Sequence, residues 1–324
     1  MEDLHDLVII GSGAAGLAAG IYAGRYGMGV LIIGGEFGGE TAKAGNIENY
    51  PGFASVDGYE LMDAMKKQSE ALGIRMIDAK VTAISREGHC FTIEAGDKTY
   101  EANAILFAIG AERRRLGLSN ENELTGKGVH YCVTCDGPVY GGKTIAMVGG
   151  GDASVKGVNL AAEYVQKIFL IVRGKEVIAE PINFERMKKL GDKVEVLLET
   201  SVKEIVGTQK LEKLILSKPY KGSSELVVDG LFVEIGAQPN VELAKSLGVE
   251  LDESGYVKVD TMMRTNVDGV FAAGDVTNHF GRFKQDITAA AQGAVAATSA
   301  YEDHKVHGDL CVLHARPESV SLHV

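Results

Sequence analysis

LVIIGSGAAG, residues 7–16, decides the fold that we expect for this chain. Four apolar residues predict a buried strand, and Gly11, Gly13 and Gly16 form a Gly-X-Gly-X-X-Gly turn before an alanine-rich helix. In this context the first glycine makes the turn, the second lets a pyrophosphate approach the backbone, and the third lets helix and strand pack closely. The stretch predicts a dinucleotide-binding unit, and glycines that serve helix packing alone are the alternative.

The same plan recurs in the second half of the chain. TIAMVGGGDAS, residues 144–154, again runs from a strand into glycines, Gly149 and Gly151, with Ser154 as a small residue at the third position. AILFAIGA at 104–111 and LFVEIGA at 231–237 end the two copies alike, each after a β-rich stretch. The fold class that we predict is α/β: two Rossmann-like dinucleotide-binding domains (three-layer ββα), each with an inserted β-meander.

The composition limits the partners and the location. The chain has 324 residues, enough for about two domains, and a net charge of −11, which argues against a large nucleic-acid surface. No apolar run reaches the ~18 residues of a membrane span. MEDLHD at residues 1–6 lacks the basic and apolar segments of a signal peptide. We therefore expect a cytoplasmic protein that binds neither nucleic acid nor membrane.

CVTCDG, residues 132–137, contains a Cys-X-X-Cys pair that is a candidate for catalysis or metal binding. In a reducing cytosol a Cys-X-X-Cys pair is more often catalytic or metal-binding than a structural disulfide. His130 makes a His-X-Cys-X-X-Cys pattern, but Cys90 and Cys311 are isolated and a structural zinc ion needs about four ligands. We therefore expect no metal. For Asp136 the alternatives are an acid–base group and a turn-forming Asp-Gly pair.

Two dinucleotides and a dithiol form an electron relay, and at this point the sequence resembles a known family. It is similar to the low-molecular-weight thioredoxin reductases, which are FAD-dependent pyridine nucleotide-disulfide oxidoreductases. The resemblance covers about residues 5–300. The motifs that carry it are GSGAAGLAAGIYAGR, GGE at 38–40, IENYPG at 47–52, CVTCDG, GGGDAS at 149–154, GAQPN at 236–240, GVFAAGDV at 269–276 and KQDITAAAQGAVAA at 284–297.

The resemblance implies an FAD-binding domain in two segments, 1–116 and 241–324, around an NAD(P)-binding domain at 117–240. It implies a homodimer, a rotation between the domains during turnover, and FAD with NADPH (NADH possible) as cofactors. The residues that it places at these cofactors are Gly11, Ser12, Gly13, Ala14, Ala15, Gly16, Glu36, Gly39, Asn49, Gly110, Gly149, Gly151, Asp152, Ala153, Ser154, Arg173, Gly274, Asp275, Lys284 and Gln285. Glu40, where the family often has glutamine, receives no role.

The resemblance also gives the cysteines separate roles. Cys135 is implied to face the flavin, Cys132 to attack the substrate disulfide, and Asp136 to exchange the proton. The expected function is a thioredoxin-disulfide reductase whose partner is thioredoxin or a similar small dithiol protein. Three alternatives stay open: a ferredoxin-dependent flavin thioredoxin reductase, an oxygen-using dithiol oxidase, and a flavin-bound redox sensor. The tail at 301–324, with Cys311, goes beyond the family core.

The chain departs from the resemblance after the second strand of the nicotinamide domain. NADPH-specific relatives carry His-Arg-Arg-X-X-X-Arg there, and its arginines bind the ribose 2′-phosphate. Here the stretch reads VRGKEVI at 172–178, so Arg173 remains while Gly174 and Ile178 replace the other two arginines. No acidic residue stands at the strand end, as it would in an NAD-preferring site. We therefore expect weak discrimination between NADPH and NADH.

Overall fold

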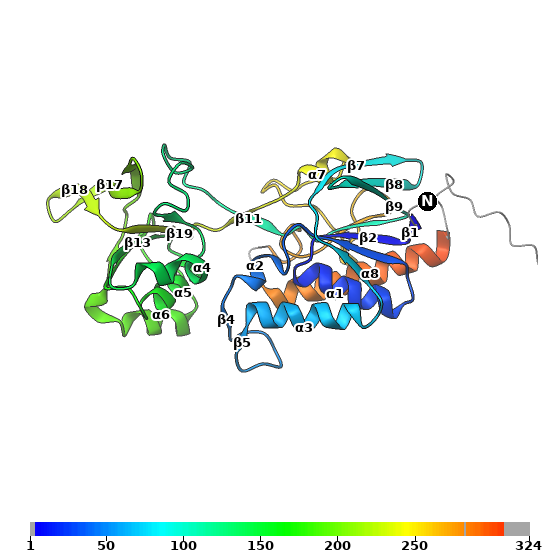
Figure 1. The fold of residues 1–324 in the computed structure, drawn as a ribbon, viewed down its shortest axis with the longest axis horizontal. Coiled ribbons are helices and arrows are strands. Elements are labelled where there is room, and N and C mark those ends of the chain that lie inside the picture. Colours follow the sequence, from blue (N-terminus) through cyan, green and yellow to red (C-terminus); the bar gives the residue numbers. More distant parts are fainter. Residues whose placement is uncertain (1–3, 282, 308–324) are drawn as a thin grey trace, which may run out of the picture. The chain divides into compact units, whose positions relative to one another are not determined.

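The computed structural model describes residues 4–281 and 283–307, and the chain divides into two compact units (Figure 1). Unit 1 combines Met1–Ala111 with Pro239–Val324, and unit 2 is Glu112–Gln238. The predicted boundaries after residues 116 and 240 lie a few residues beyond these points. The two connections pair with each other as β11 (Ala111–Arg113) and β20 (Ala237–Pro239), so no loop composition marks the division in the sequence.

Unit 1 is built on a five-stranded parallel sheet of order β21-β10-β2-β3-β6. Alternate residues of β2 enter two cores. Leu7 and Ile9 pack against the helices, and Val8 and Ile10 pack against the meander. β2 is therefore apolar on both faces, which is why the sequence shows an unbroken apolar run there. The strands are β2 (Leu7–Ile10), β3 (Val30–Ile33), β6 (Arg75–Ile77), β10 (Ile105–Phe107) and β21 (Val270–Ala272).

Helices cover one face of this sheet and an antiparallel sheet covers the other (Figure 1). The helices are α1 (Ala14–Arg25), α3 (Gly58–Glu70) and α8 (Asp286–His307). The second sheet consists of β7 (Val81–Glu87), β8 (Cys90–Ala95) and β9 (Lys98–Ala102), with β1 (Leu4–His5) added parallel to β9. Smaller elements of this unit are α2 (Gly39–Ala42), β4 (Asn46–Ile47), β5 (Val56–Asp57) and α7 (Glu242–Ser246).

Unit 2 repeats this three-layer plan. Its parallel sheet has the order β12-β19-β13-β14-β15, with Ile145 and Met147 facing helices and Ala146 and Val148 facing a meander. The sheet strands are β12 (Val129–His130), β13 (Thr144–Val148), β14 (Lys167–Ile171), β15 (Val194–Leu197) and β19 (Gly230–Val233); the helices are α4 (Val133–Asp136), η1 (Gly137–Tyr140), α5 (Asp152–Ala161), α6 (Pro181–Lys188) and η2 (Gly191–Lys193). The meander is β16 (Val202–Gly207), β17 (Leu211–Tyr220) and β18 (Ser223–Val227).

The predicted fold class is confirmed: each unit carries a parallel sheet between helices and a meander. Within the residues that the structure describes, no helix combines the length and apolar character needed to cross a lipid bilayer. Cys311 and most of the tail lie outside the described residues.

Candidate active site

In unit 1 the carboxyl ends of neighbouring strands carry the turns that the sequence singled out. β2 leads into Gly11, β10 leads into Gly110, and β21 leads into Gly274 and Asp275. These three strands are parallel and adjacent. The turns therefore lie at one edge of the sheet, which is the edge where open α/β sheets bind their ligands.

The glycines of the first turn are required by close backbone contacts. Gly11 has a φ of +113°, and a Cβ there would lie 2.2 Å from the carbonyl oxygen of Ala108. A Cβ on Gly16 would lie 1.9 Å from the carbonyl oxygen of Gly11. A Cβ on Gly13 would meet only the carbonyl oxygen of Gly38, at 3.8 Å. The backbone at Gly13 is thus open on one side, as the approach of a pyrophosphate requires.

The first turn of α1 offers backbone donors to an anion. Gly13 supplies no side-chain cap, and the turn contains no acidic residue. Ala14 and Ala15 are buried, and the hydroxyl of Ser12 donates to the carbonyl oxygen of Glu36 at 3.1 Å. Free amide groups at a helix N-terminus, together with the helix dipole, stabilise a bound phosphate. These residues fit the diphosphate of a dinucleotide.

Glu36 lies near this turn, but its side chain points to a lysine. Its carboxylate contacts Lys43 Nζ at 2.8 Å, and Glu40 contacts the same ammonium at 3.3 Å. Gly39 lies beside the turn, since a Cβ there would be 3.7 Å from the Cα of Gly13. The structure thus pairs Glu36 and Glu40 through one lysine, a contact that the sequence did not predict.

Two segments far apart in the sequence meet in unit 1 through polar side chains. Asn49 Nδ2 donates to Gln285 Oε1 at 2.9 Å, although 236 positions separate them. Lys284 Nζ donates to the carbonyl oxygen of Thr277. Burial raises the pKa of Asp275 to about 6, although the Lys284 charge opposes the shift. Asn49, Lys284, Gln285 and Asp275 were all predicted, and the structure places them in the same unit as the first glycine turn.

The second glycine turn repeats these contacts in unit 2. Gly149 has a φ of +146°, and a Cβ there would lie 2.2 Å from the carbonyl oxygen of Glu234. At Gly151 a Cβ would meet no atom within 4 Å, so this position is open. Ser154, in place of the third glycine, is buried and donates to the carbonyl oxygen of Gly151 at 2.7 Å. Ala153 is exposed in the first turn of α5.

The side chain of Asp152 binds polar groups of its own unit. Its Oδ1 accepts from the backbone N–H of Glu180 and from Asn183 Nδ2, both at 3.0 Å, and Lys156 Nζ lies 3.1 Å from its Oδ2. Burial alone would raise the pKa of Asp152, but the hydrogen bonds from Asn183 and Glu180 and the charge of Lys156 outweigh burial and lower it. The carboxylate therefore ties the first turn of α5 to the start of α6.

The loop that follows β14 is held by its main chain. The carbonyl oxygen of Gly174 accepts from Glu199 N at 2.9 Å, and the N–H of Ile178 donates to Gly150 O at 2.7 Å. The Arg173 side chain is exposed, and Ile178 is 73% exposed. The side chains of Arg173 and Ile178 are thus exposed to solvent, while main-chain hydrogen bonds hold the loop in position.

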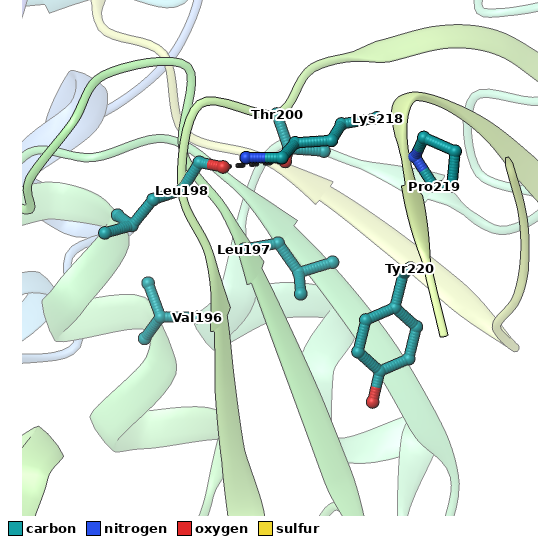
Figure 2. Close-up of a pocket in the computed structure, with 7 residues that line it drawn as sticks. All are labelled: Val196, Leu197, Leu198, Thr200, Lys218, Pro219 and Tyr220. Carbon is teal, nitrogen blue, oxygen red and sulfur yellow. Dashed lines mark hydrogen bonds between the residues drawn. The ribbon is translucent and has the colours of Figure 1, made fainter. Parts of the chain in front are cut away.

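A pocket of about 300 Å³ lies next to this loop in unit 2 (Figure 2). Its wall includes Leu198 and Thr200, which are linked by a hydrogen bond of 2.8 Å from the threonine hydroxyl to the leucine carbonyl oxygen. The full lining is Val196, Leu197, Leu198, Thr200, Lys218, Pro219 and Tyr220. None of the predicted nucleotide-binding residues lines this pocket.

Cys132 and Cys135 form a disulfide at the ends of one helical turn, with their Cα atoms 5.4 Å apart. Cys132 caps the short helix α4, and its Sγ accepts from the N–H of Cys135 at 3.1 Å. Cys135 is exposed on unit 2 and Cys132 is partly buried. A Cys-X-X-Cys loop of this kind can open and close while the backbone stays in place, because the bond joins neighbouring turns.

The carboxylate of Asp136 reaches a buried histidine instead of its own turn. Asp136 Oδ2 lies 3.2 Å from His130 Nδ1, and Asp136 makes no side-chain cap of the following η1 helix. Gly137 has an ordinary helical φ of −58°. A Cβ there would lie 2.5 Å from the Tyr164 hydroxyl, so lack of space requires this glycine. These contacts support the acid–base interpretation of Asp136 over the Asp-Gly turn.

His130 and Tyr140 are the residues near the disulfide that received no catalytic role from the sequence. His130 is 6% exposed, and its Nε2 lies 2.7 Å from the Tyr140 hydroxyl. The His-X-Cys-X-X-Cys spacing drew attention to His130 only as a metal ligand. In the described part of the chain no group of three or more His, Cys, Asp or Glu side chains could hold a metal ion.

Comparison with known proteins places this geometry in a family. The family of pyridine nucleotide-disulphide oxidoreductases matches residues 5–297. This chain belongs to that family. A thioredoxin reductase of Mycolicibacterium smegmatis is 39% identical over 303 residues, which span 92% of this chain and 96% of the relative. The predicted resemblance and the predicted enzyme class, an oxidoreductase that acts on a disulfide, are confirmed.

Solved structures agree with this assignment. Thioredoxin reductase from Lactococcus lactis superposes with a TM-score of 0.87 at 33% identity, covering 92% of this chain and 98% of that one. The enzyme from T. acidophilum gives the same TM-score at 35% identity, covering 94% and 100%. A ferredoxin-flavin thioredoxin reductase from Clostridium acetobutylicum is 33% identical with a TM-score of 0.51. Membership implies a flavin and a nicotinamide cofactor.

Proposed function

We propose that this family member is a thioredoxin-disulfide reductase that passes electrons from NAD(P)H through FAD to the Cys132–Cys135 disulfide. The substrate is thioredoxin or a similar small dithiol protein, and the enzyme works as a homodimer in the cytoplasm. The observation that carries the proposal is the disulfide itself, which lies in the same unit as the second glycine turn and beside Asp136. A unit that only bound a nucleotide would not need this disulfide.

The chain offers a fitting site for each cofactor. In unit 1 the FAD diphosphate would bind at the open backbone of Gly13 and the first turn of α1, with Asp275, Asn49 and Gln285 toward the rest of the molecule. In unit 2 the nicotinamide dinucleotide would bind at Gly151 and the exposed loop after β14. The flavin, when bound, supplies two electrons for the disulfide.

The cysteines and Asp136 carry out the remaining steps. Two electrons and one proton break the Cys132–Cys135 bond and leave one thiol and one thiolate. The sulfur of Cys132 attacks the substrate disulfide, so a mixed disulfide forms and one substrate sulfur leaves with a proton. Cys135 then attacks the Cys132 sulfur, which releases the second substrate sulfur as a thiolate and restores the bond; this thiolate takes the second proton from water. Asp136 holds and returns the proton during these exchanges.

Substitution of each cysteine tests this assignment. Cys132→Ser is expected to abolish thioredoxin reduction and to keep flavin reduction by the nicotinamide donor, and Cys135→Ser is also expected to stop turnover. FAD absorbance, near one per chain, serves as the control for folding. Near-normal thioredoxin reduction by either variant would show that the relay is misassigned. Cys135→Ser also leaves Cys132 free to trap the substrate of a cell extract as a mixed disulfide, and a trapped protein of another fold would redirect the substrate proposal.

The ferredoxin-dependent alternative differs from the proposed function in the electron donor that reduces the flavin. Anaerobic stopped-flow absorbance follows the flavin after mixing with NADPH or NADH. Fast bleaching by either nucleotide supports the proposal. No bleaching by either nucleotide, together with reduction by ferredoxin, would favour the alternative, for which the Clostridium acetobutylicum relative provides the precedent.

A further inference from the structure

His130 has a polar side-chain atom close to each of its ring nitrogens inside unit 2. Nδ1 faces Asp136 Oδ2 at 3.2 Å, and Nε2 faces the Tyr140 hydroxyl at 2.7 Å. The ring also stacks on Phe232, with the centroids 5.3 Å apart and an angle of 26° between the planes. A buried histidine with two polar partners is held in one orientation. Its position is therefore fixed by Asp136, Tyr140 and Phe232.

This chain of three groups can change its proton count without moving a heavy atom. When His130 is neutral and carries its proton on Nδ1, that N–H lies beside the Asp136 carboxylate and the Tyr140 hydroxyl donates to Nε2. When the ring is protonated, both nitrogens donate and the hydroxyl accepts, because a phenol can do either. Burial, and then the charges of Asp136 and Asp229, raise the pKa of Tyr140, so the phenol keeps its own proton at neutral pH.

We propose that His130 is a positioning residue that shares with Asp136 the proton exchanged by Cys132. The inference rests on the proposed function, since it concerns the disulfide exchange of that enzyme. In the forward step the Cys132 thiol gives its proton to the Asp136–His130 pair, its sulfur bonds to one substrate sulfur, and the substrate S–S bond breaks. The leaving sulfur then takes that proton. No electrons enter or leave this exchange, so no further reactant is needed.

The surroundings of the pair define which other charges act on it. On its own strand and on β19 the ring meets only Phe232 among the aromatic contacts. From η1 it meets Tyr140, which in turn is influenced by Asp229 and has Lys143 Nζ 5.3 Å from its ring centroid. From α4 it meets Asp136. Asp136 is the one carboxylate among these in direct contact with the ring.

The consequence is a pH dependence that a carboxylate alone would not give. Attack by Cys132 requires that the Asp136–His130 pair can accept a proton. The rate of attack therefore decreases at pH values low enough to protonate the pair, and this decrease is the acid limb of the pH profile. An imidazole is a stronger base than a carboxylate, so the acid limb of a pair that includes His130 lies at higher pH than that of Asp136 alone. His130→Gln keeps donors and acceptors for both partners but holds no extra proton. We expect the acid limb to move down by about 2 pH units.

The test uses neither thioredoxin nor a nicotinamide. The FAD-bound protein is reduced with dithiothreitol, desalted anaerobically and mixed with a small aromatic disulfide, 4,4′-dithiodipyridine, across pH 4.5 to 9. Wild type, His130→Gln and the control His89→Gln, a change at an exposed turn, are compared. We expect the shift only in His130→Gln. An acid limb at the wild-type pH in His130→Gln would overturn the inference, because a purely structural histidine leaves that limb in place.

A second measurement covers the case in which His130→Gln does not fold. The ring ¹³C signal of His130 in the reduced wild-type protein is followed by NMR over the same pH range. It is expected to change within the pH interval of the acid limb, and a signal that stays constant there would overturn the inference. Failure of the proposed function would give a different result. The protein would then not reduce thioredoxin, while the acid limb of its reaction with 4,4′-dithiodipyridine would still depend on His130.

Discussion

Two arginines introduced into the loop after β14 should change the selectivity of the nicotinamide site. We expect the site to discriminate weakly between NADPH and NADH in the wild type and to select NADPH in the variant. The family pattern places three arginines at the ribose 2′-phosphate, and this chain keeps only Arg173. Gly174→Arg and Ile178→Arg restore the other two. For the wild type we expect NADPH to be favoured only modestly and NADH to be usable.

The structure allows both side chains without strain. The φ of Gly174 does not lie in the left-handed region, and the nearest atom to a Cβ there is the carbonyl oxygen of Glu176 at 3.5 Å. The Ile178 side chain is 73% exposed, while its N–H holds the loop to Gly150. A charge-assisted hydrogen bond contributes about 1.5–3 kcal/mol, and exposure favours the lower value. Each arginine should therefore raise the NADPH/NADH preference about tenfold, and both together about a hundredfold.

The assay is steady-state kcat/KM for each nucleotide, with thioredoxin as acceptor. Ile182→Arg is the matched control, because Ile182 is also an exposed isoleucine but lies on α6 outside the loop. A ratio that does not change in the double variant would refute the assignment of this loop. A wild-type preference for NADPH above about a thousandfold, roughly 4 kcal/mol, would refute the expectation of weak discrimination.

Three further predictions follow from individual contacts. Asp136→Asn should slow formation of the dithiol at least about tenfold while FAD stays bound; unchanged reoxidation kinetics across pH would remove Asp136 from the mechanism. Gly16→Ala puts a Cβ 1.9 Å from Gly11 O, so we expect about 1–3 kcal/mol less stability and less bound FAD, measured by urea unfolding and flavin absorbance; full FAD content would contradict this. Burial raises the pKa of Asp275 to about 6, so between about pH 4 and 6 the folded protein holds a proton that the unfolded chain has released, and rising pH costs stability. Asp275→Asn should remove this penalty, at most about 3 kcal/mol, and so stabilise the FAD-free protein more at pH 7.5 than at pH 4.5 in urea unfolding; equal gains would refute the cause.

The glycine turns show what a sequence can predict about a site. Gly11 and Gly149 need a positive φ and a backbone oxygen within van der Waals reach, and no other residue meets both demands. The demand is local, so a spacing of glycines between a strand and a helix is enough to recognise it. The redox pair Cys132–Cys135 was also recognised from its sequence spacing, since a disulfide across one helical turn needs no distant partner, whereas the separate roles of the two cysteines came from the resemblance.

The partners of the polar side chains depend on the tertiary structure and could not be predicted from local sequence patterns. The sequence presented Glu36 and Asp152 as nucleotide ligands, and the structure directs Glu36 to Lys43 and Asp152 to the start of α6. Asn49 meets Gln285 across 236 positions, and no local pattern contains that pairing. The unit boundaries fall inside a paired ribbon, where composition gives no signal.

The sequence by itself determined the two Rossmann-like units, the family and the redox pair, because strand periodicity, glycine stereochemistry and Cys-X-X-Cys spacing are properties of adjacent residues. Only the tertiary structure decided that His130 faces both Asp136 and Tyr140. Those contacts depend on how β12, α4 and η1 pack, and a side chain on a buried strand receives its partners from the elements that cover it.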